Sequence, residues 1–150
     1  MFTVHALDAD ALESVRRTGK DVSGNPPVPY VAEGGEPVRC CLRDATPGER
    51  LLLFGYEPML PAGPYREIGP VFAHAQACAG PAGDGYPADW RSRPQVLRAY
   101  DERGWIHPAT RVHDGTDPVG ELEAVLAQPG VVRVDSRNIA YGCYMFTVTR

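Results

Sequence analysis

The sequence predicts an α+β fold, with a mainly antiparallel sheet and about two helices in a single domain over residues 1–150. Three observations predict this class. Several short apolar runs have the length and spacing of strands, and two other stretches combine a cap with the apolar periodicity of a helix. The segments between them are rich in turn residues, since the chain contains 15 prolines and 16 glycines. A chain of 150 residues can also bury a substantial core.

The N-terminal residues predict a strand followed by a helix. Apolar and polar side chains alternate from Phe2 to Ala6, as on a strand with one buried face. A helix over about 9–18 is expected next, because Asp8 or Asp10 can cap its start and Gly19 can end it.

The middle of the chain predicts strands separated by loops. Prolines and glycines leave little room for regular structure over 19–37, which is therefore expected to be a loop. The continuous apolar run at 50–57 is typical of a strand buried on both faces, and a second strand is expected at 70–76. Residues 96–101 and 110–112 are expected to pair around the turn between them.

The C-terminal third predicts the second helix and two strands. Asp117 can cap the helix, Pro118 fits its first turn, and Pro129-Gly130 ends it. Strands follow at about 131–135 and 141–149. The apolar stripe of the helix consists of Val119, Leu122, Val125 and Leu126.

The composition excludes several classes of partner. The formal net charge is −4, and Lys20 is the one lysine beside fourteen arginines, which argues against a nucleic-acid surface. No run approaches the roughly 18 apolar residues of a membrane span, and residues 1–20 do not resemble a targeting segment. We therefore expect a cytoplasmic protein with reduced cysteines and no membrane contact. Whether it forms homo-oligomers stays open.

Cys143 is the first candidate for a reactive group. It alternates with Tyr144, Phe146 and Val148, which are expected to face the core, so its thiol is expected to point away from the main apolar layer. Arg137 and Asn138 come shortly before it in the chain, and a nearby arginine favours the nucleophilic thiolate. The alternative is that Cys143 is a small buried apolar residue.

His74 and Cys78 lie four residues apart, a spacing that puts them on one face of a strand or of a helix. Such a pair can act as base and nucleophile, or it can supply two ligands to zinc. The alternative is a histidine that is simply hydrogen-bonded. Cys40 and Cys41 are adjacent and are expected to point to opposite sides of a strand, so both are not expected to serve one site.

Arginines near these cysteines can bind a carboxylate or a phosphate through paired hydrogen bonds. The alternative is that they are surface residues or pair with Asp44, Glu49 and Asp101. The four arginines in question are Arg39, Arg43, Arg98 and Arg137.

An ordered set of short motifs extends from about Pro37 to the end of the chain. It includes Pro37-x-Arg39-x-x-Leu42, Asp44-Ala45-x-Pro47-Gly48-Glu49, Pro64-Tyr65-Arg66, Leu97-Arg98-Ala99-Tyr100-Asp101 and Asn138 with Gly142-Cys143. In these motifs the chain resembles a bacterial family known as domain of unknown function 1203, which brings no activity with it. The chain departs from the family pattern at Val38, where members carry cysteine, and at Arg137, where they often carry histidine.

The leading hypothesis is a protein that binds or transforms a small anionic metabolite and needs no cofactor. Cys143 would be the catalytic or contact thiol and His74 its base. Whether turnover occurs stays open. The residues expected to hold the ligand are Arg39, Arg98, Tyr100, Arg137 and Asn138.

Two other classes of function remain. The chain can be a zinc-binding domain that uses Cys41, His74, Cys78 and Cys143 as ligands. It can also be a non-enzymatic protein-interaction module whose cysteines only fill the core.

Overall fold

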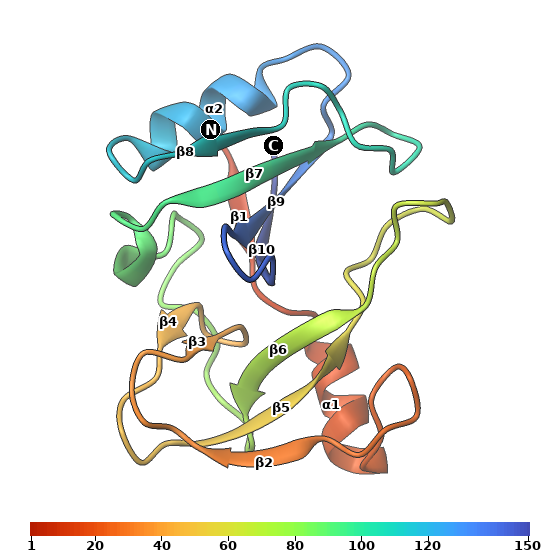
Figure 1. Cartoon of the computed structure of the whole chain (residues 1–150), viewed down its shortest axis with the longest axis vertical. Coiled ribbons are helices and arrows are strands. Elements are labelled where there is room, and N and C mark those ends of the chain that lie inside the picture. The colour runs from red at the N-terminus through yellow and green to blue at the C-terminus, as the bar shows by residue number, and fades with distance from the viewer.

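The α+β class is confirmed by a computed structural model that describes all 150 residues. It contains two five-stranded sheets where the sequence predicted one, two α-helices, and a short 3-10 helix η1 at Ala88–Trp90. Figure 1 shows sheet A in the upper half of the molecule, beneath α2, and sheet B in the lower half, beside α1. None of the helices is long and apolar enough to cross a membrane.

Sheet A is antiparallel throughout and has the order β1-β10-β9-β7-β8. Helix α2 (Pro118–Leu126) packs on it, and Leu122 joins Trp90 and Phe146 in a shared apolar core. The predicted cap is confirmed, because the Asp117 side chain accepts a hydrogen bond from the backbone N–H of Gly120. The strands are β1 (Thr3–His5), β7 (Gln95–Tyr100), β8 (Arg111–His113), β9 (Arg133–Asn138) and β10 (Tyr144–Thr149).

Sheet B has the order β2-β5-β6-β3-β4. Its pairs are antiparallel except β3 with β6, which run parallel. Helix α1 (Ala9–Thr18) begins at the Asp8 cap and ends at Gly19, as predicted, and buries Leu12 and Val15 in a second apolar core. The strands are β2 (Val28–Val31), β3 (Pro37–Val38), β4 (Arg43–Asp44), β5 (Arg50–Tyr56) and β6 (Gly69–His74).

The prediction of a loop over 19–37 was wrong, because this segment contains β2 and the start of β3. Strand β2 lies at the edge of sheet B and pairs only with β5. An edge strand tolerates Pro29, which lacks a backbone donor, so the prolines did not prevent pairing here.

The predicted alternation along the last strand was also wrong. The pairing of β10 with β9 shifts register between Tyr144 and Phe146. As a result Tyr144 packs in the core of sheet B, whereas Phe146 and Val148 pack in the core of sheet A. A bulge of this kind redirects side chains that a regular strand would place on one face.

The two halves are joined by polar contacts as well as by packing. The indole N–H of Trp90 donates to Asp44 Oδ1 over 2.9 Å, and Arg93 also pairs with Asp44. The Nε–H of Arg39 donates to the carbonyl oxygen of Tyr144 over 2.8 Å. These bonds fix the β3–β4 hairpin of sheet B against the elements of sheet A.

His113 was expected at the surface, but the structure buries it at 2% exposure. The N–H of Gly115 donates to its Nδ1 over 3.1 Å, so Nε2 carries the proton and faces the Tyr86 hydroxyl at 3.2 Å. Burial lowers the pKa of His113 below its usual 6.5.

This lowered pKa predicts a loss of stability in mild acid. Below about pH 6.5 the unfolded chain binds a proton at His113 that the folded chain refuses, so the free energy of unfolding falls until the pH has passed the folded pKa. We expect His113→Gln to flatten the fall of the melting temperature between pH 7 and mild acid. The same change at exposed His5 is the control, and equal slopes for wild type and His113→Gln would contradict the prediction.

Candidate functional site

The residues predicted to carry chemistry separate into two groups. Cys40, Cys41, His74 and Cys78 form one group, which we call the thiol–imidazole cluster. Cys143 lies in the other group, with Arg39 and Asn138 along one cleft. All four cysteines are free thiols.

The thiol–imidazole cluster depends on the turn of the β3–β4 hairpin. Residues 39–42 form this turn instead of a strand, and Leu42 adopts a left-handed φ of 56°. The prediction that Cys40 and Cys41 point apart was therefore wrong. Their Sγ atoms lie 3.4 and 3.9 Å from the same atom, Nδ1 of His74 at the end of β6.

Cys78 completes the cluster from the segment that follows β6. Its Sγ lies 3.1 Å from Sγ of Cys40, which also accepts a hydrogen bond from the backbone N–H of His74 over 3.3 Å. Cys40 is buried, whereas Cys78 and His74 are half-buried. Three atoms that can bind a metal ion therefore lie close together just beneath the surface: the Sγ atoms of Cys40 and Cys78, and Nδ1 of His74.

A carboxylate holds the far side of the His74 ring. Nε2 of His74 lies 3.1 Å from Oε1 of Glu49, and Arg43 binds both carboxylate oxygens over 2.5 and 2.9 Å. The backbone N–H of Thr46 adds a third donor to Glu49. The Arg43 hydrogen bonds hold the pKa of Glu49 well below its usual range, so Glu49 is ionised near neutral pH.

The two adjacent thiols differ in acidity. The hydrogen bond shared with Cys41, together with burial, raises the pKa of Cys40, while the same bond and the charge of Arg43 lower the pKa of Cys41. Burial alone would lower the pKa of His74, but its bonds to Cys78 and Glu49 outweigh this and raise it. The cluster thus couples the Cys41 thiol, whose pKa is lowered, to the His74 imidazole, whose pKa is raised.

The second group surrounds Arg39, which is only 2% exposed. Its guanidinium donates to the carbonyl oxygens of Tyr144 and Pro37, over 2.8 and 2.5 Å, and forms no ion pair with any carboxylate. Burial lowers the pKa of Arg39 to about 10.

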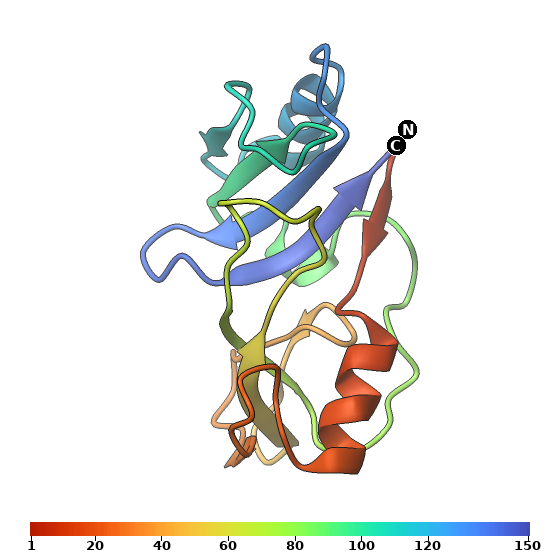
Figure 2. The ribbon, with the colours of Figure 1, turned by 90° about the vertical axis from the view of Figure 1, so that its right-hand side faces the viewer.

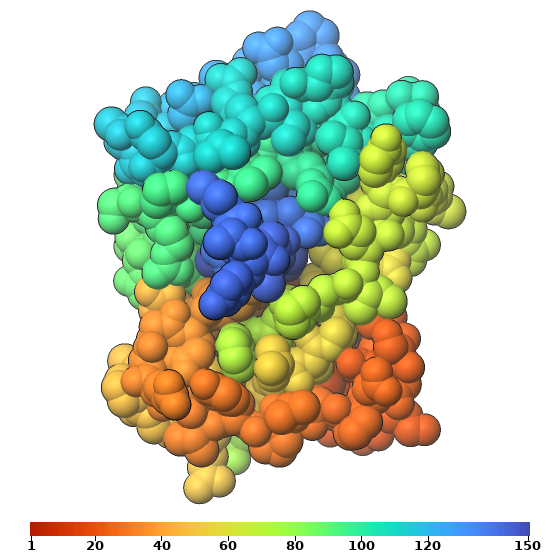
Figure 3. All heavy atoms as spheres, viewed as in Figure 1, coloured from red at the N-terminus to blue at the C-terminus, as the bar shows by residue number.

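Arg39 opens onto a cleft of about 440 Å³, which we call the Arg39 cleft. The C-terminal hairpin forms one wall, and Figure 3 shows the blue C-terminal residues at the centre of this face, above the orange residues of sheet B. Asn138 ends β9, and its backbone N–H donates to the carbonyl oxygen of Cys143 over 2.9 Å, which closes the hairpin. The other lining residues are Gly34, Gly35, Glu36, Pro37, Leu53, Pro70, Phe72 and Tyr141.

Three predicted ligand-binding residues lie outside this cleft. Arg98 pairs with Glu67 over 2.6 Å, an acidic partner that the sequence did not predict. Tyr100 is buried, at 1% exposure, and does not line the cleft. Arg137 donates to the carbonyl oxygen of Gly142 and lies 3.7 Å from Glu67, in an adjoining hollow that it shares with Cys143.

His74 contacts Cys40, Cys41 and Glu49 and does not line the Arg39 cleft, so the predicted pairing of His74 with Cys143 is not formed. The predicted zinc set divides in the same way, because Cys143 stays apart from the other three residues. Cys40, which was not in the predicted zinc set, occupies the place expected of Cys143.

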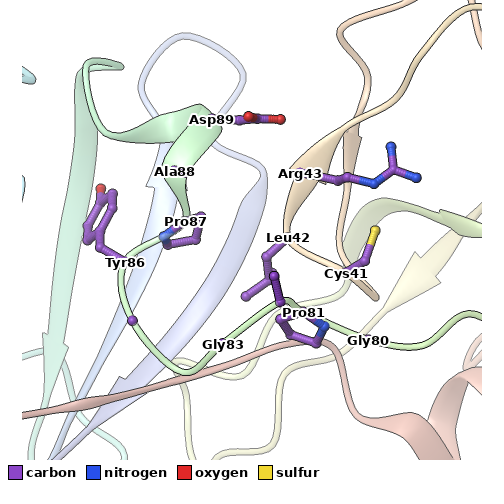
Figure 4. A pocket seen from close by; sticks show the side chains of 12 residues that line it. Cys41, Leu42, Arg43, Gly80, Pro81, Gly83, Tyr86, Pro87, Ala88 and Asp89 are labelled. Atoms are coloured by element: carbon purple, nitrogen blue, oxygen red, sulfur yellow. The ribbon is translucent and has the colours of Figure 1, made fainter.

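A third hollow, of about 590 Å³, lies between the β3–β4 turn and the segment before η1. Figure 4 shows Cys41 and Arg43 on one side of it and Pro87 to Asp89 on the other. Cys41 thus connects the thiol–imidazole cluster to the surface.

Glu49 was predicted only as a partner for arginine. Its place directly after the Thr46-Pro47-Gly48 turn was a sign of a fixed position beside β5.

Residues 35–150 match the family described as "Protein of unknown function (DUF1203)". The chain belongs to the DUF1203 family. The resemblance predicted from the motifs is thereby confirmed, and the DUF1203 region contains both the thiol–imidazole cluster and Arg39, Asn138 and Cys143. No curated protein matches the chain. No solved structure matches it either.

Proposed function

We propose that this DUF1203 protein binds a small organic anion in the Arg39 cleft. The observation that carries the proposal is a buried guanidinium without a carboxylate partner. Buried charges in proteins are normally paired, because taking an ion out of water is costly. Two carbonyl oxygens satisfy part of Arg39, and a bound carboxylate would supply the missing charge.

The walls of the cleft favour a particular kind of anion. Leu53, Pro70 and Phe72 offer apolar surface, which suits a ligand with a hydrocarbon or aromatic body. Glu36 also lines the cleft, and its oxygens accept hydrogen bonds from the N–H groups of Glu33 and Gly34. The negative charge of Glu36 repels a ligand that carries more than one negative charge. We therefore expect a monocarboxylate in preference to a phosphate or a dicarboxylate.

Asn138 and Cys143 supply polar contacts at the mouth of the cleft. The Cys143 thiol lies 3.9 Å from the carbonyl oxygen of Tyr141 and has no histidine partner among its hydrogen bonds. His74, the predicted base, does not line the cleft. The arrangement therefore supports ligand binding more directly than catalysis.

Arg39→Met should abolish carboxylate binding. Benzoate at about 100 times its dissociation constant should stabilise the wild type by about 2.7 kcal/mol, which raises the melting temperature by about 5–11 °C. The variant should show no such rise, because a thioether cannot pair with the carboxylate. The shift is measured against the ligand-free melting temperature of each protein, so a change in fold stability does not enter.

Arg17→Met is the matched control, since Arg17 is exposed on α1 and makes no ion pair. It should keep the full benzoate shift. Inorganic phosphate should shift neither protein. A benzoate shift in Arg39→Met as large as in the wild type would contradict the proposal. In the wild type, bound benzoate should also slow the alkylation of Cys143 by iodoacetamide.

A further inference from the structure

Three of the four residues of the thiol–imidazole cluster have the spacing of a metal site. The Sγ atoms of Cys40 and Cys78 and a ring nitrogen of His74 all lie within 4.8 Å of one another. Ligand atoms on one tetrahedral zinc, at bond lengths of about 2.0–2.3 Å, are separated by about 3.5–3.8 Å. The measured contacts of 3.1 and 3.4 Å to Cys40 Sγ lie close to this range.

We propose that Cys40, Cys78 and Nδ1 of His74 bind one zinc ion, with Cys41 as the fourth ligand. Cys41 Sγ lies 3.9 Å from the same Nδ1 atom, on a turn that carries both adjacent thiols toward His74. The four residues then form a Cys3His set, which is a common structural zinc site. Thiolate and imidazole together favour zinc over the harder ions magnesium and calcium.

The surroundings of His74 fit the role of a metal ligand. The Glu49 carboxylate can only accept a hydrogen bond, so its contact with Nε2 puts the proton there and leaves the lone pair of Nδ1 facing the thiols. A carboxylate behind a metal-bound histidine is a recurrent arrangement that fixes the ring and raises its basicity. Arg43 and the N–H of Thr46 hold Glu49 in turn.

Charge and access also agree with an ion. Three thiolates, a neutral imidazole and Zn²⁺ sum to one negative charge, and Arg43 lies next to the cluster, with Nη2 3.4 Å from Nε2 of His74. Cys41 faces the hollow in Figure 4, which gives the ion a route from solvent. This site is separate from the Arg39 cleft, so each proposal can fail without the other.

A disulfide between Cys40 and Cys78 is the competing explanation for their short contact. Its formation would release the two thiol protons and pass two electrons to an oxidant, and it would leave the orientation of the His74 Nδ1 atom toward sulfur unexplained. The oriented imidazole and the third thiol favour the metal.

The test is zinc binding by the full chain, reduced, stripped with EDTA and titrated against a chromogenic chelator. The wild type should bind about one zinc ion. Cys78→Ser and His74→Gln should each lose it, and Glu49→Gln should bind about 10–100-fold more weakly. Cys143→Ser, the cysteine outside the cluster, is the matched control and should bind as the wild type does. Cobalt should give a thiolate charge-transfer band that Cys41→Ser weakens.

Several outcomes would overturn the site. A reduced wild type that takes up no zinc excludes it, as does an equal loss in Cys143→Ser and Cys78→Ser. A purified chain that is about 2 Da lighter until reduced, and binds no zinc after reduction, assigns the pair to a disulfide. An unchanged cobalt band in Cys41→Ser removes Cys41 from the ligand set. Circular dichroism of each variant separates lost binding from lost folding.

Discussion

Removal of zinc should lower the melting temperature of the protein by about 8–16 °C. A ligand present at about 1,000 times its dissociation constant stabilises the folded state by about 4 kcal/mol, and each kcal/mol changes the melting temperature of a chain of this size by about 2–4 °C. The reason is local: the ion would tie the β3–β4 turn, the end of β6 and the segment at Cys78 to one point. Thermal melts by circular dichroism, with zinc and then with EDTA, measure the change.

The control for this result is Cys78→Ser, which lacks a ligand and should melt at the same temperature with zinc and with EDTA. A wild type that behaves like this variant would contradict the prediction. Benzoate should still stabilise the zinc-free protein, because the Arg39 cleft does not include the ligand residues.

Asp135→Ala should destabilise the protein by about 3–5 kcal/mol, the range for breaking a buried ion pair by removing one partner. Asp135 is 1% exposed and accepts hydrogen bonds from Arg133, over 2.8 and 3.1 Å, and from the hydroxyl of Thr147 over 2.9 Å. Without the carboxylate, the charge of Arg133 is left mostly buried and unpaired. Urea denaturation should show a lower midpoint with an unchanged slope.

Asp101→Ala is the matched control, because Asp101 also pairs with an arginine, but that partner, Arg103, is largely exposed. Exposed pairs contribute about 0–1 kcal/mol. A loss in Asp135→Ala no larger than that in Asp101→Ala would show that the Arg133–Asp135 pair does not behave as a buried ion pair.

The two helices were predictable because their signals are local. Asp8 with Gly19, and Asp117 with Pro118, lie within the segments that they delimit. The division of strands between two sheets was not predictable, since pairing depends on contacts between distant residues. Strand β2 illustrates this, because its pairing with β5 forms despite Pro29.

The candidate residues were easier to foresee than their grouping. The family motifs singled out Arg39, Arg98, Asn138 and Cys143, and all of these except Arg98 line one cleft. The cluster around His74 was only partly foreseen, because the convergence of Cys40 and Cys41 follows from the left-handed backbone at Leu42. A non-glycine residue rarely adopts that conformation, so no residue type signalled it.

The pairing of β1 with β10 has a consequence for how the chain folds as it is made. Thr3 pairs with Thr149, and Figure 2 shows the two ends of the chain side by side. The strands of sheet B all come from residues 28–74, so they can assemble while synthesis continues. Strand β1 is translated before the other strands of sheet A and has no partner until β10, which follows them all in the sequence, has also been made. Sheet A therefore cannot close before Tyr144–Thr149 has been translated, and a ribosome stalled before β10 holds a nascent chain in which β1 is still unpaired.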